Sequence, residues 1–468
     1  MKKLLLAGGL SLALIWSCGS DNSAETKDQS QLGFINYSVA QDNDFTGLPA
    51  LQSFVFASYQ NYWIMFSGRT NGFHGFDTSA TGSGDFPVSK ANTNIYVYDT
   101  QQHQLYTMPI PFTGDQACVF MSTNLPHTQQ GNTLYACGGY GPTTPSGPDA
   151  NKTYNYFMKI DLPSFVQGVI NNQPTSVVNS VAWCQSNYVA NTGGELFLLP
   201  DHNFYLCVGH NFTGTYGDQQ AIQRYQDKVN VFSLSESNNQ LTINFIDSIT
   251  DGLNDTLTQF HRRDLCVAPC IQQDGSTVGI SIYGGVFRYT SGSPYNNNGL
   301  NWTNPIYINY NNTPKYFIET GANQYANIYS TAFCCMYDKN EKKMMTTFFG
   351  GLGNETGGYD STANWTNLIT TAERSYLGSG NGTTNFVTNL NRLPAYLGAE
   401  SVFIPASGLP WYNEAYKIID YTKLKPGTVI GYIYGGIISA DAAGTVRPPS
   451  TSNVYAVTYN MNYPPATK

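Results

Sequence analysis

Short apolar runs that stop on one or two glycines recur along the whole chain. One of them reads ISIYGG, and others read LYACGG, TTFFGG and YIYGG. The stops follow one another at intervals of 66 to 85 residues, at these positions: Gly68, Gly138, Gly209, Gly284, Gly350 and Gly435. Self-similarity at a regular period marks an array of supersecondary units. The sequence therefore predicts six structural repeats.

Each repeat carries further strand signals around its glycine stop. The run RRDLCVAPCI precedes ISIYGG, and the polar segment QQDGST between them is typical of a hairpin turn. An alternating run follows the loop after the glycines, as in NIYVYDT and KVNVFSL, and a fourth run such as LTINFID completes several repeats. Four antiparallel strands repeated six times predict an all-β, six-bladed β-propeller. Six unrelated hairpins in a β-sandwich are the alternative.

The second and third runs of each repeat resemble the kelch repeat, with two apolar residues, a double glycine and then a YVYD-like strand. The segments RRDLCVAP, YIYGG and NIYVYDTQQHQLYTMPIP carry this resemblance. The first and third repeats keep a single glycine, and all repeats exceed the usual kelch length of about 50 residues. In such a fold, glycine allows close backbone approach and positive φ where the second strand ends.

The two ends of the repeat region predict how the fold closes. Little chain follows the alternating run NVYAVTYN in the last repeat, so that repeat lacks a fourth strand of its own. The run LGFINYSVA, residues 32–40, precedes the first repeat and alternates like a strand. We therefore expect residues 32–40 to supply the outer strand of the sixth blade, in one propeller over residues 32–468.

The first residues predict export and a lipid anchor. Two lysines and a short apolar stretch give residues 1–17 the layout of a signal peptide. The IWSC segment resembles a bacterial lipobox, which implies lipidation of Cys18; ordinary cleavage near Ser17, giving a soluble periplasmic protein, is the alternative. Residues 18–31 are polar and predict a disordered tether. Ser20, Asp21 and Asn22 resemble the surface-export signal of some Bacteroidetes lipoproteins, so we expect an outer-membrane lipoprotein on the cell surface or the periplasmic face.

The composition of the chain argues against several classes of partner and cofactor. Charged residues make up only 12% of the chain and the formal net charge is −8, which argues against nucleic acid as a partner. Eight cysteines follow Cys18, without a CxxC pair or zinc-site spacing, so neither a metal nor a cofactor is expected. Most of these cysteines lie in strand-like runs and are expected to be small buried hydrophobic residues. A disulfide between Cys118 and Cys137 is the alternative.

The loops after the glycine stops are long, whereas most turns between the first and second strands are short. Long loops on a rigid scaffold are where binding usually occurs. Aromatic and basic residues in or near these loops are the candidate binding residues for a glycan or a protein: Arg69, His74, Phe76, Tyr140, His210, Tyr216, Arg224, Arg288, Tyr289, Trp302 and Trp365. The alternative is that the aromatic residues pack their own loops onto the blades.

The mouth of the central channel is a second candidate site. By repeat position, six residues are expected to open the first strands there: Gln52, Gln116, Asn187, Arg263, Ser330 and Glu400. Arg263 and Glu400 are the only charges in this set. Two roles remain open for them: they fix a small polar ligand, or they neutralise each other.

Catalytic motifs give little support for an enzyme. The six histidines form no HExxH motif, and the chain has no GxSxG elbow. Kelch-like propellers include a copper-radical oxidase family, whose copper ligands are not traceable here, and a periplasmic sialic acid mutarotase. The second resemblance implies proton transfer by Arg263, Glu400, Arg224 and His261. The preferred prediction is a lipid-anchored module that binds an envelope protein, such as an outer-membrane β-barrel complex, or a glycan; a mutarotase-like enzyme is the alternative.

Overall fold

A computed structural model describes residues 34–462, apart from short segments at 75–85, 148–149, 216–219, 238–239, 255–256, 289–300, 325–328, 353–364, 378–379 and 445–447. Ile35–Met461 form one compact unit; Met1–Phe34 and Asn462–Lys468 form a second. The expected signal peptide, Cys18 and the tether lie outside the described residues. Among the described residues, no helix has the length and apolar character needed to cross a membrane.

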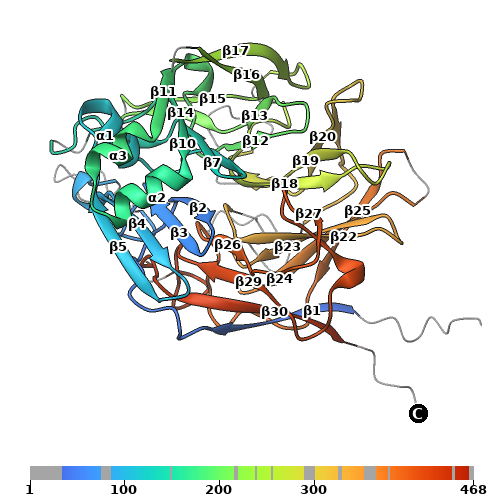
Figure 1. The fold of residues 1–468 in the computed structure, drawn as a ribbon. Coiled ribbons are helices and arrows are strands. Elements are labelled where there is room, and N and C mark those ends of the chain that lie inside the picture. Colours follow the sequence, from blue (N-terminus) through green and yellow to red (C-terminus); the bar gives the residue numbers. More distant parts are fainter. Residues whose placement is uncertain are drawn as a thin grey trace, which may run out of the picture. The chain divides into compact units, whose positions relative to one another are not determined.

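The fold is all-β, as the runs predicted, and its sheets follow one another along the chain (Figure 1). The first sheet contains β2 (Val55–Tyr59), β3 (Tyr62–Phe66), β4 (Asn94–Asp99) and β5 (Gln104–Pro109). The second contains β6 (His127–Gln130), β7 (Thr133–Cys137), β10 (Tyr156–Asp161) and β11 (Val181–Gln185). The third contains β12 (Glu195–Leu198), β13 (Phe204–Cys207), β16 (Val229–Ser237) and β17 (Gln240–Ile249).

The remaining three consecutive sheets include one with extra strands and one that joins both ends of the fold. The fourth contains β18 (Arg263–Ile271), β19 (Val278–Val286), β20 (Ile306–Ile308) and β21 (Tyr316–Ile318). The fifth contains β22 (Phe333–Asp338), β23 (Lys343–Phe349), β24 (Ile369–Ser375) and β25 (Thr383–Thr388), with β28 (Ile418–Asp420) and β27 (Trp411–Asn413) added beside β22. The sixth contains β26 (Val402–Pro405), β29 (Val429–Tyr434), β30 (Val454–Asn462) and β1 (Phe34–Gln41), with β1 at its edge.

The long loops contribute a seventh sheet, whereas most of the helices lie in other connections. Two loop hairpins pair with each other through β8 (Tyr140–Pro142), β9 (Asn151–Thr153), β14 (His210–Thr213) and β15 (Ile222–Tyr225). The helices are α1 (Gly114–Phe120), α2 (Leu162–Ile170) and α3 (Pro174–Asn179), with the short η2 (Val88–Lys90), η3 (Asn187–Val189) and η4 (Tyr421–Lys423). The Asp161 carboxylate caps α2 by accepting from Ser164 N at 3.1 Å.

The glycine stops join neighbouring sheets through the backbone. At each stop two consecutive residues have positive φ, and Ser67 and Val208 take the first of these positions in the repeats that keep one glycine. A Cβ atom built on Gly350 would lie 1.9 Å from Leu397 O. The second residue of the pair donates its N–H to the next sheet in these bonds: Gly68 to Ser122, Gly139 to Asn191, Gly209 to Arg262, Gly351 to Leu397 and Gly436 to Leu51. The expected close backbone approach is confirmed.

A second series of backbone hydrogen bonds runs between the residues that immediately precede or open the first strands. Six residues take positive φ there, and we call them the left-handed set: Ser53, Asn124, Gly193, Asp264, Ser330 and Glu400. Their N–H groups donate to the preceding sheet in these bonds: Asn124 to Ser53, Gly193 to Asn124, Asp264 to Gly193 and Glu400 to Ser330. Ser53 N donates to Glu400 O at 3.3 Å, which joins the first sheet to the sixth.

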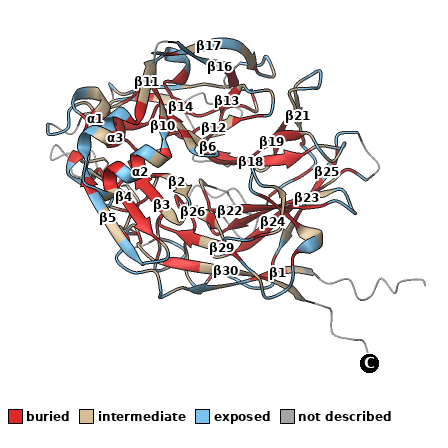
Figure 2. Ribbon diagram, viewed as in Figure 1, coloured by how far each residue is buried: buried red, intermediate tan, exposed pale blue. Residues whose placement is uncertain are grey.

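Apolar side chains of neighbouring sheets pack against one another, so many strand residues are buried (Figure 2). The eight cysteines after Cys18 are all free; seven are buried and Cys184 is half-buried. Cys118 lies on α1 rather than on a strand and is not bonded to Cys137. The expectation of small buried cysteines is therefore confirmed, and the alternative disulfide is absent.

Candidate functional site

Residues from the first strand of every consecutive sheet line a single cavity of about 350 Å³, which lies within the size range of small-molecule sites. The six strands contribute, among others, Phe56, His127, Glu195, Leu265, Phe333 and Val402. Of the left-handed set, only Ser330 lines it. The cavity therefore extends along the first strands, away from that set and toward the short turns.

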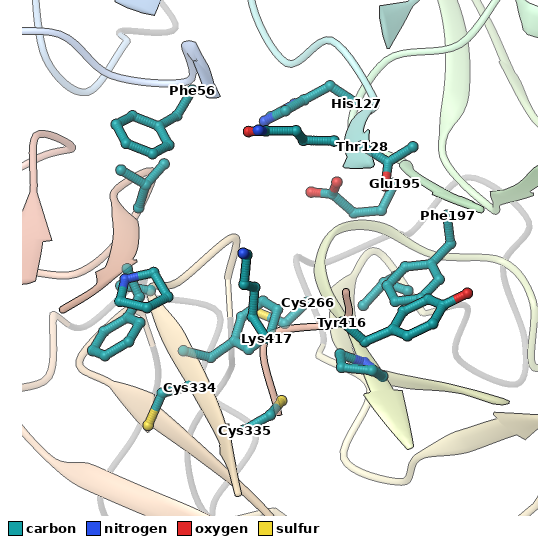
Figure 3. Close-up of a pocket in the computed structure, with 18 of the residues that line it drawn as sticks. Phe56, His127, Thr128, Glu195, Phe197, Cys266, Cys334, Cys335, Tyr416 and Lys417 are labelled. Atoms are coloured by element: carbon teal, nitrogen blue, oxygen red, sulfur yellow. The ribbon is translucent and has the colours of Figure 1, made fainter. Parts of the chain in front are cut away.

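The Glu195 side chain points into this cavity from the third sheet (Figure 3). The carboxyl group is half-buried because it reaches only the cavity space, with protein around it. This poor solvation raises the pKa of Glu195 to about 8, and the nearby Glu400 carboxyl adds to the effect. Glu195 is therefore mostly protonated near neutral pH and can donate as well as accept a hydrogen bond.

His127 enters the cavity from the second sheet (Figure 3). Its Nδ1 lies 2.9 Å from Leu125 O; since a carbonyl only accepts, Nδ1 carries the proton. Burial lowers the pKa of His127, so the ring is neutral near pH 7 and Nε2 is left as a hydrogen-bond acceptor. The neighbouring Gln129 amide instead joins two sheets, accepting from Ser58 N and donating to Ser58 O.

The hairpin of β27 and β28, which is inserted in the chain between β26 and β29 of the sixth sheet, covers part of the cavity. Its strand β28 pairs in parallel with β22, so that Cys335 lies opposite Ile418. The Tyr416 hydroxyl donates to Leu198 O at 3.0 Å, and its ring stacks on Phe197 with centroids 6.0 Å apart. The hairpin therefore spans from the fifth sheet to the third, across the axis of the first strands.

Lys417, at the tip of this hairpin, is exposed and points its Nζ into the cavity (Figure 3). The Nζ lies 5.5 Å from the centre of the Trp411 ring, and no carboxylate of the described residues forms an ion pair with it. Three polar groups thus face the cavity. Glu195 is a weak acid, His127 offers a hydrogen-bond acceptor, and Lys417 carries an ammonium group.

A group of carboxyl groups lies at the end of the cavity nearest the left-handed set. The Glu400 carboxylate accepts a short hydrogen bond from the Ser53 hydroxyl. Burial raises the pKa of Glu400 to about 8, and the neighbouring Asp264 charge adds to this. Burial also raises the pKa of Asp264, although its ion pair with Arg263 at 3.6 Å opposes the shift. The Arg263 charge lowers the pKa of Glu400 and the Asp264 charge raises it, so these three side chains belong to one electrostatic group.

Beyond Arg263, the same group continues into two histidines. Arg263 Nη1 donates to His210 Nε2 at 3.5 Å, and burial, together with Arg263 and His261, holds the pKa of His210 well below its ordinary value. His261 Nδ1 donates to Asp227 at 2.8 Å. The His261 ring stacks on Tyr225, with centroids 3.8 Å apart. His210, His261 and Arg263 are all buried. Their contacts hold the loop hairpin of β14 and β15 against the fourth sheet.

The structure places the other predicted residues at varied depths. Arg69, Tyr140, Trp302 and Trp365 are buried, His74 and Arg288 are half-buried, and Arg224 is exposed. Trp302 Nε1 donates to His261 O at 2.7 Å, and the Tyr140 hydroxyl donates to Gly214 O at 2.5 Å. These side chains pack the loops onto the sheets, which is the alternative stated above. Phe76, Tyr216 and Tyr289 lie outside the described residues.

The prediction for two members of the channel mouth was wrong. Gln116 lies on α1 and Asn187 on η3, so neither opens a first strand. Their predicted positions fall in the connections before the second and third sheets, which form helices. Asn124 and Gly193 hold the corresponding positions.

Sequence reasoning missed Glu195, His127 and Lys417. Glu195 follows the Gly193–Gly194 pair directly and opens β12, so a register anchored on the first strands would have found it. Lys417 carried no such signal because its hairpin leaves the repeat pattern. Within the described ranges, no three His, Cys, Asp or Glu side chains come together in a way that could hold a metal ion.

Comparison with known proteins gives one structural likeness to report. No protein-family model and no curated protein matches the chain. A solved structure titled "Structure of YjhT" is similar with a TM-score of 0.47 and 12% sequence identity, covering 89% of this chain and 98% of that one.

Proposed function

We propose that the chain is a six-bladed β-propeller closed by β1, anchored by a lipid on Cys18 at the outer membrane, and that it binds a small glycan in the cavity between its blades. Two series of inter-sheet backbone bonds support the six-bladed architecture. Each series joins the first four sheets in order and the fifth to the sixth, and the bonds from Ser53 to Glu400 and from Gly436 to Leu51 join the sixth sheet to the first.

The cavity is the observation that carries the binding role. Ligand sites are typically concave and mostly apolar, with a few convergent polar groups. Aromatic walls from Phe56 and the Phe197–Tyr416 stack suit the apolar faces of a sugar ring. Glu195, His127 and Lys417 supply the donors and acceptors that hydroxyl groups need. A glycan in the cavity is favoured over a protein on the long loops, because three of the loop aromatics that the structure describes, Tyr140, Trp302 and Trp365, are buried.

The mutarotase-like alternative has one specific observation in its favour. Glu195 and Glu400 both have pKa values of about 8, close to the pH at which a general acid or base works best. Only Glu195 lines the cavity, whereas Arg263, His261 and Glu400 are buried. Arg224 is exposed on β15 and does not line it. A proton-transfer role would therefore fall on Glu195 first.

Titration of mono- and disaccharides into the purified chain, followed by calorimetry, tests the proposal. We expect at least one sugar to bind and both Glu195→Gln and Lys417→Met to weaken it about tenfold. Arg224→Met, on an exposed loop strand, is the matched control and should leave the affinity unchanged. Binding that survives the two cavity changes but is lost with Arg224→Met would move the site to the loops. If the wild-type chain exchanges sugar anomers in an NMR assay and Glu195→Gln does not, the mutarotase-like alternative is favoured.

The lipid anchor and its location have a separate test. Cys18→Ser should move the protein from the membrane fraction to the soluble fraction, because it removes the thiol that would carry the lipid. Retention of Cys18→Ser in membranes after a high-salt wash would contradict lipidation as the main anchor. Purification of the lipidated protein in detergent, with identification of what accompanies it, tests the envelope-protein partner; a stoichiometric outer-membrane β-barrel would support that partner.

A further inference from the structure

The residues that line the cavity differ in exposure from one end to the other. Three of them are exposed: Gln130 at the end of β6, and Ala415 and Lys417 in the turn between β27 and β28. Asp264 and Glu400, which belong to the left-handed set at the opposite end, are buried. The lining therefore reaches solvent at the short-turn end, beside the hairpin of β27 and β28.

The hairpin is attached to the fifth sheet through its backbone. Strand β28 pairs in parallel with β22, from the pair of Cys335 with Ile418 to the pair of Tyr337 with Asp420. The Asp420 carboxylate at the end of β28 also forms an ion pair at 3.7 Å with Lys339, in the turn that follows β22. This side of the hairpin is therefore fixed by a row of backbone pairs and by a buried carboxylate.

Two tyrosine hydroxyl groups hold the other side of the hairpin. The Tyr416 hydroxyl donates to Leu198 O in the third sheet at 3.0 Å. The Tyr412 hydroxyl donates to Gly275 O, in the turn between β18 and β19 of the fourth sheet. Among the residues that the structure describes, no backbone hydrogen bond joins the hairpin to either of these sheets. Both tyrosine side chains are half-buried, so water can replace the carbonyl partners when the turn moves.

The difference between the two sides determines which part of the hairpin moves most easily. A segment that few bonds hold opens locally at a lower free energy than a paired strand in the core. Ile418 and Ile419 of β28 are buried beside β22, whereas Ala415 and Lys417 of the turn are exposed. We therefore expect the turn to lift from the third and fourth sheets while β28 stays paired with the fifth.

We propose that the hairpin of β27 and β28 is a strap that controls the entry of ligands into the cavity. It closes the short-turn end when both tyrosine bonds are made and opens that end when they break. The inference rests on the proposed function for the identity of the ligand. Lids of this kind admit a ligand and then separate it from water. Tyr416 and Lys417 line the closed cavity, so a bound ligand contacts both side chains only after the strap has closed.

Labelling of a cavity cysteine tests the strap without any need for a bound ligand. Cys266 lines the cavity and is buried. The probe is a methanethiosulfonate reagent that carries one hexose, and mass spectrometry measures its rate of reaction at each cysteine. Tyr412→Phe combined with Tyr416→Phe should raise the rate at Cys266 at least tenfold, since each hydrogen bond contributes about fivefold. Tyr434→Phe is the matched control and should stay within twofold of wild type, because that hydroxyl also donates to a backbone carbonyl, Pro49 O, but outside the hairpin.

Two further cysteines distinguish opening of the strap from opening of the whole fold. Cys137 and Cys207 are buried in the second and third sheets and do not line the cavity. A faster reaction at Cys266 alone supports the strap, and an unchanged rate at Cys266 in the double variant overturns it. If all three cysteines react faster, the single variants Tyr412→Phe and Tyr416→Phe decide. A rise of about fivefold confined to Cys266 then supports the strap, and the lack of such a rise overturns it.

The labelling result is independent of the test for sugar binding. Calorimetry that finds no bound sugar would count against the proposed glycan, and the reaction rates at Cys266 would still decide whether the hairpin controls entry.

Discussion

The two ends of the cavity use charged residues in opposite ways. At the end formed by the left-handed set, Arg263, Asp264 and Glu400 are buried and contact one another or nearby protein groups. At the hairpin end, Lys417 is exposed and forms no ion pair with a described carboxylate. Buried pairs that lose one partner destabilise a protein strongly, whereas exposed charges contribute little to stability. The comparison indicates that the first end maintains the fold and the second is available for ligand.

The largest effect is expected where the backbone of neighbouring sheets comes closest. Gly350→Val should lower the free energy of unfolding by about 4 kcal/mol or more, because the new side chain meets Leu397 O and must adopt a positive φ. Gly408→Val is the matched control, since Gly408 has positive φ but open space around it. Urea denaturation measures both. Equal losses of unfolding free energy in the two variants would mean that positive φ, and not the close approach to Leu397, explains why position 350 is a glycine.

Removal of the buried cation of Arg263 should have the next largest effect on stability. Arg263→Met should cost about 3 kcal/mol, because it leaves Asp264 and His210 buried without their partner. Sugar affinity, measured by calorimetry, should stay within twofold of wild type. Arg224→Met removes an exposed guanidinium and should change stability by less than about 0.5 kcal/mol. A tenfold loss of affinity in Arg263→Met would make that end part of the ligand site.

The raised carboxyl pKa values predict a dependence of stability on pH. Glu400 has a pKa of about 8 in the folded state against 4.5 ordinarily, so the folded protein binds more protons between these two values. Stability therefore falls as pH rises through this window, by roughly 2 kcal/mol if neighbouring carboxyls take up part of the ionisation. Glu400→Gln should flatten the profile of unfolding free energy between pH 5 and 8.5. A profile identical to wild type would show that Glu400 ionises normally.

The smallest effect on stability is expected at the hairpin end. Lys417→Met should change the free energy of unfolding by less than about 0.5 kcal/mol, because the side chain is exposed. The same substitution should reduce sugar affinity about tenfold, whereas Lys90→Met, at an exposed lysine elsewhere, should not. A large loss of stability in Lys417→Met would mean that this lysine holds the hairpin in place, and the contrast between the two ends would fail.

Much of the fold could be predicted from the sequence because its signals are local. Alternating runs such as NIYVYDT and LTINFID form strands β4 and β17. The glycine stops marked the places where second strands end at positive φ, including the two repeats in which Ser67 and Val208 replace a glycine. Of the residues predicted at the channel mouth, Arg263 lies near enough to Glu400 to lower its pKa. Gln116 and Asn187 instead lie on helices, because the connections before the second and third sheets form α1 and η3.

The sequence by itself determined the all-β class, the strand order within each repeat and the places where glycine is required, because alternation and positive φ depend on neighbouring residues. Tertiary structure alone decided which side chains share the cavity. Glu195 and Lys417 are 222 residues apart in the chain, and they converge only because first strands from six sheets and one inserted hairpin surround the same space. Desolvation in that space also sets the pKa of Glu195, and burial of this kind is a property of the assembled fold that no local pattern encodes.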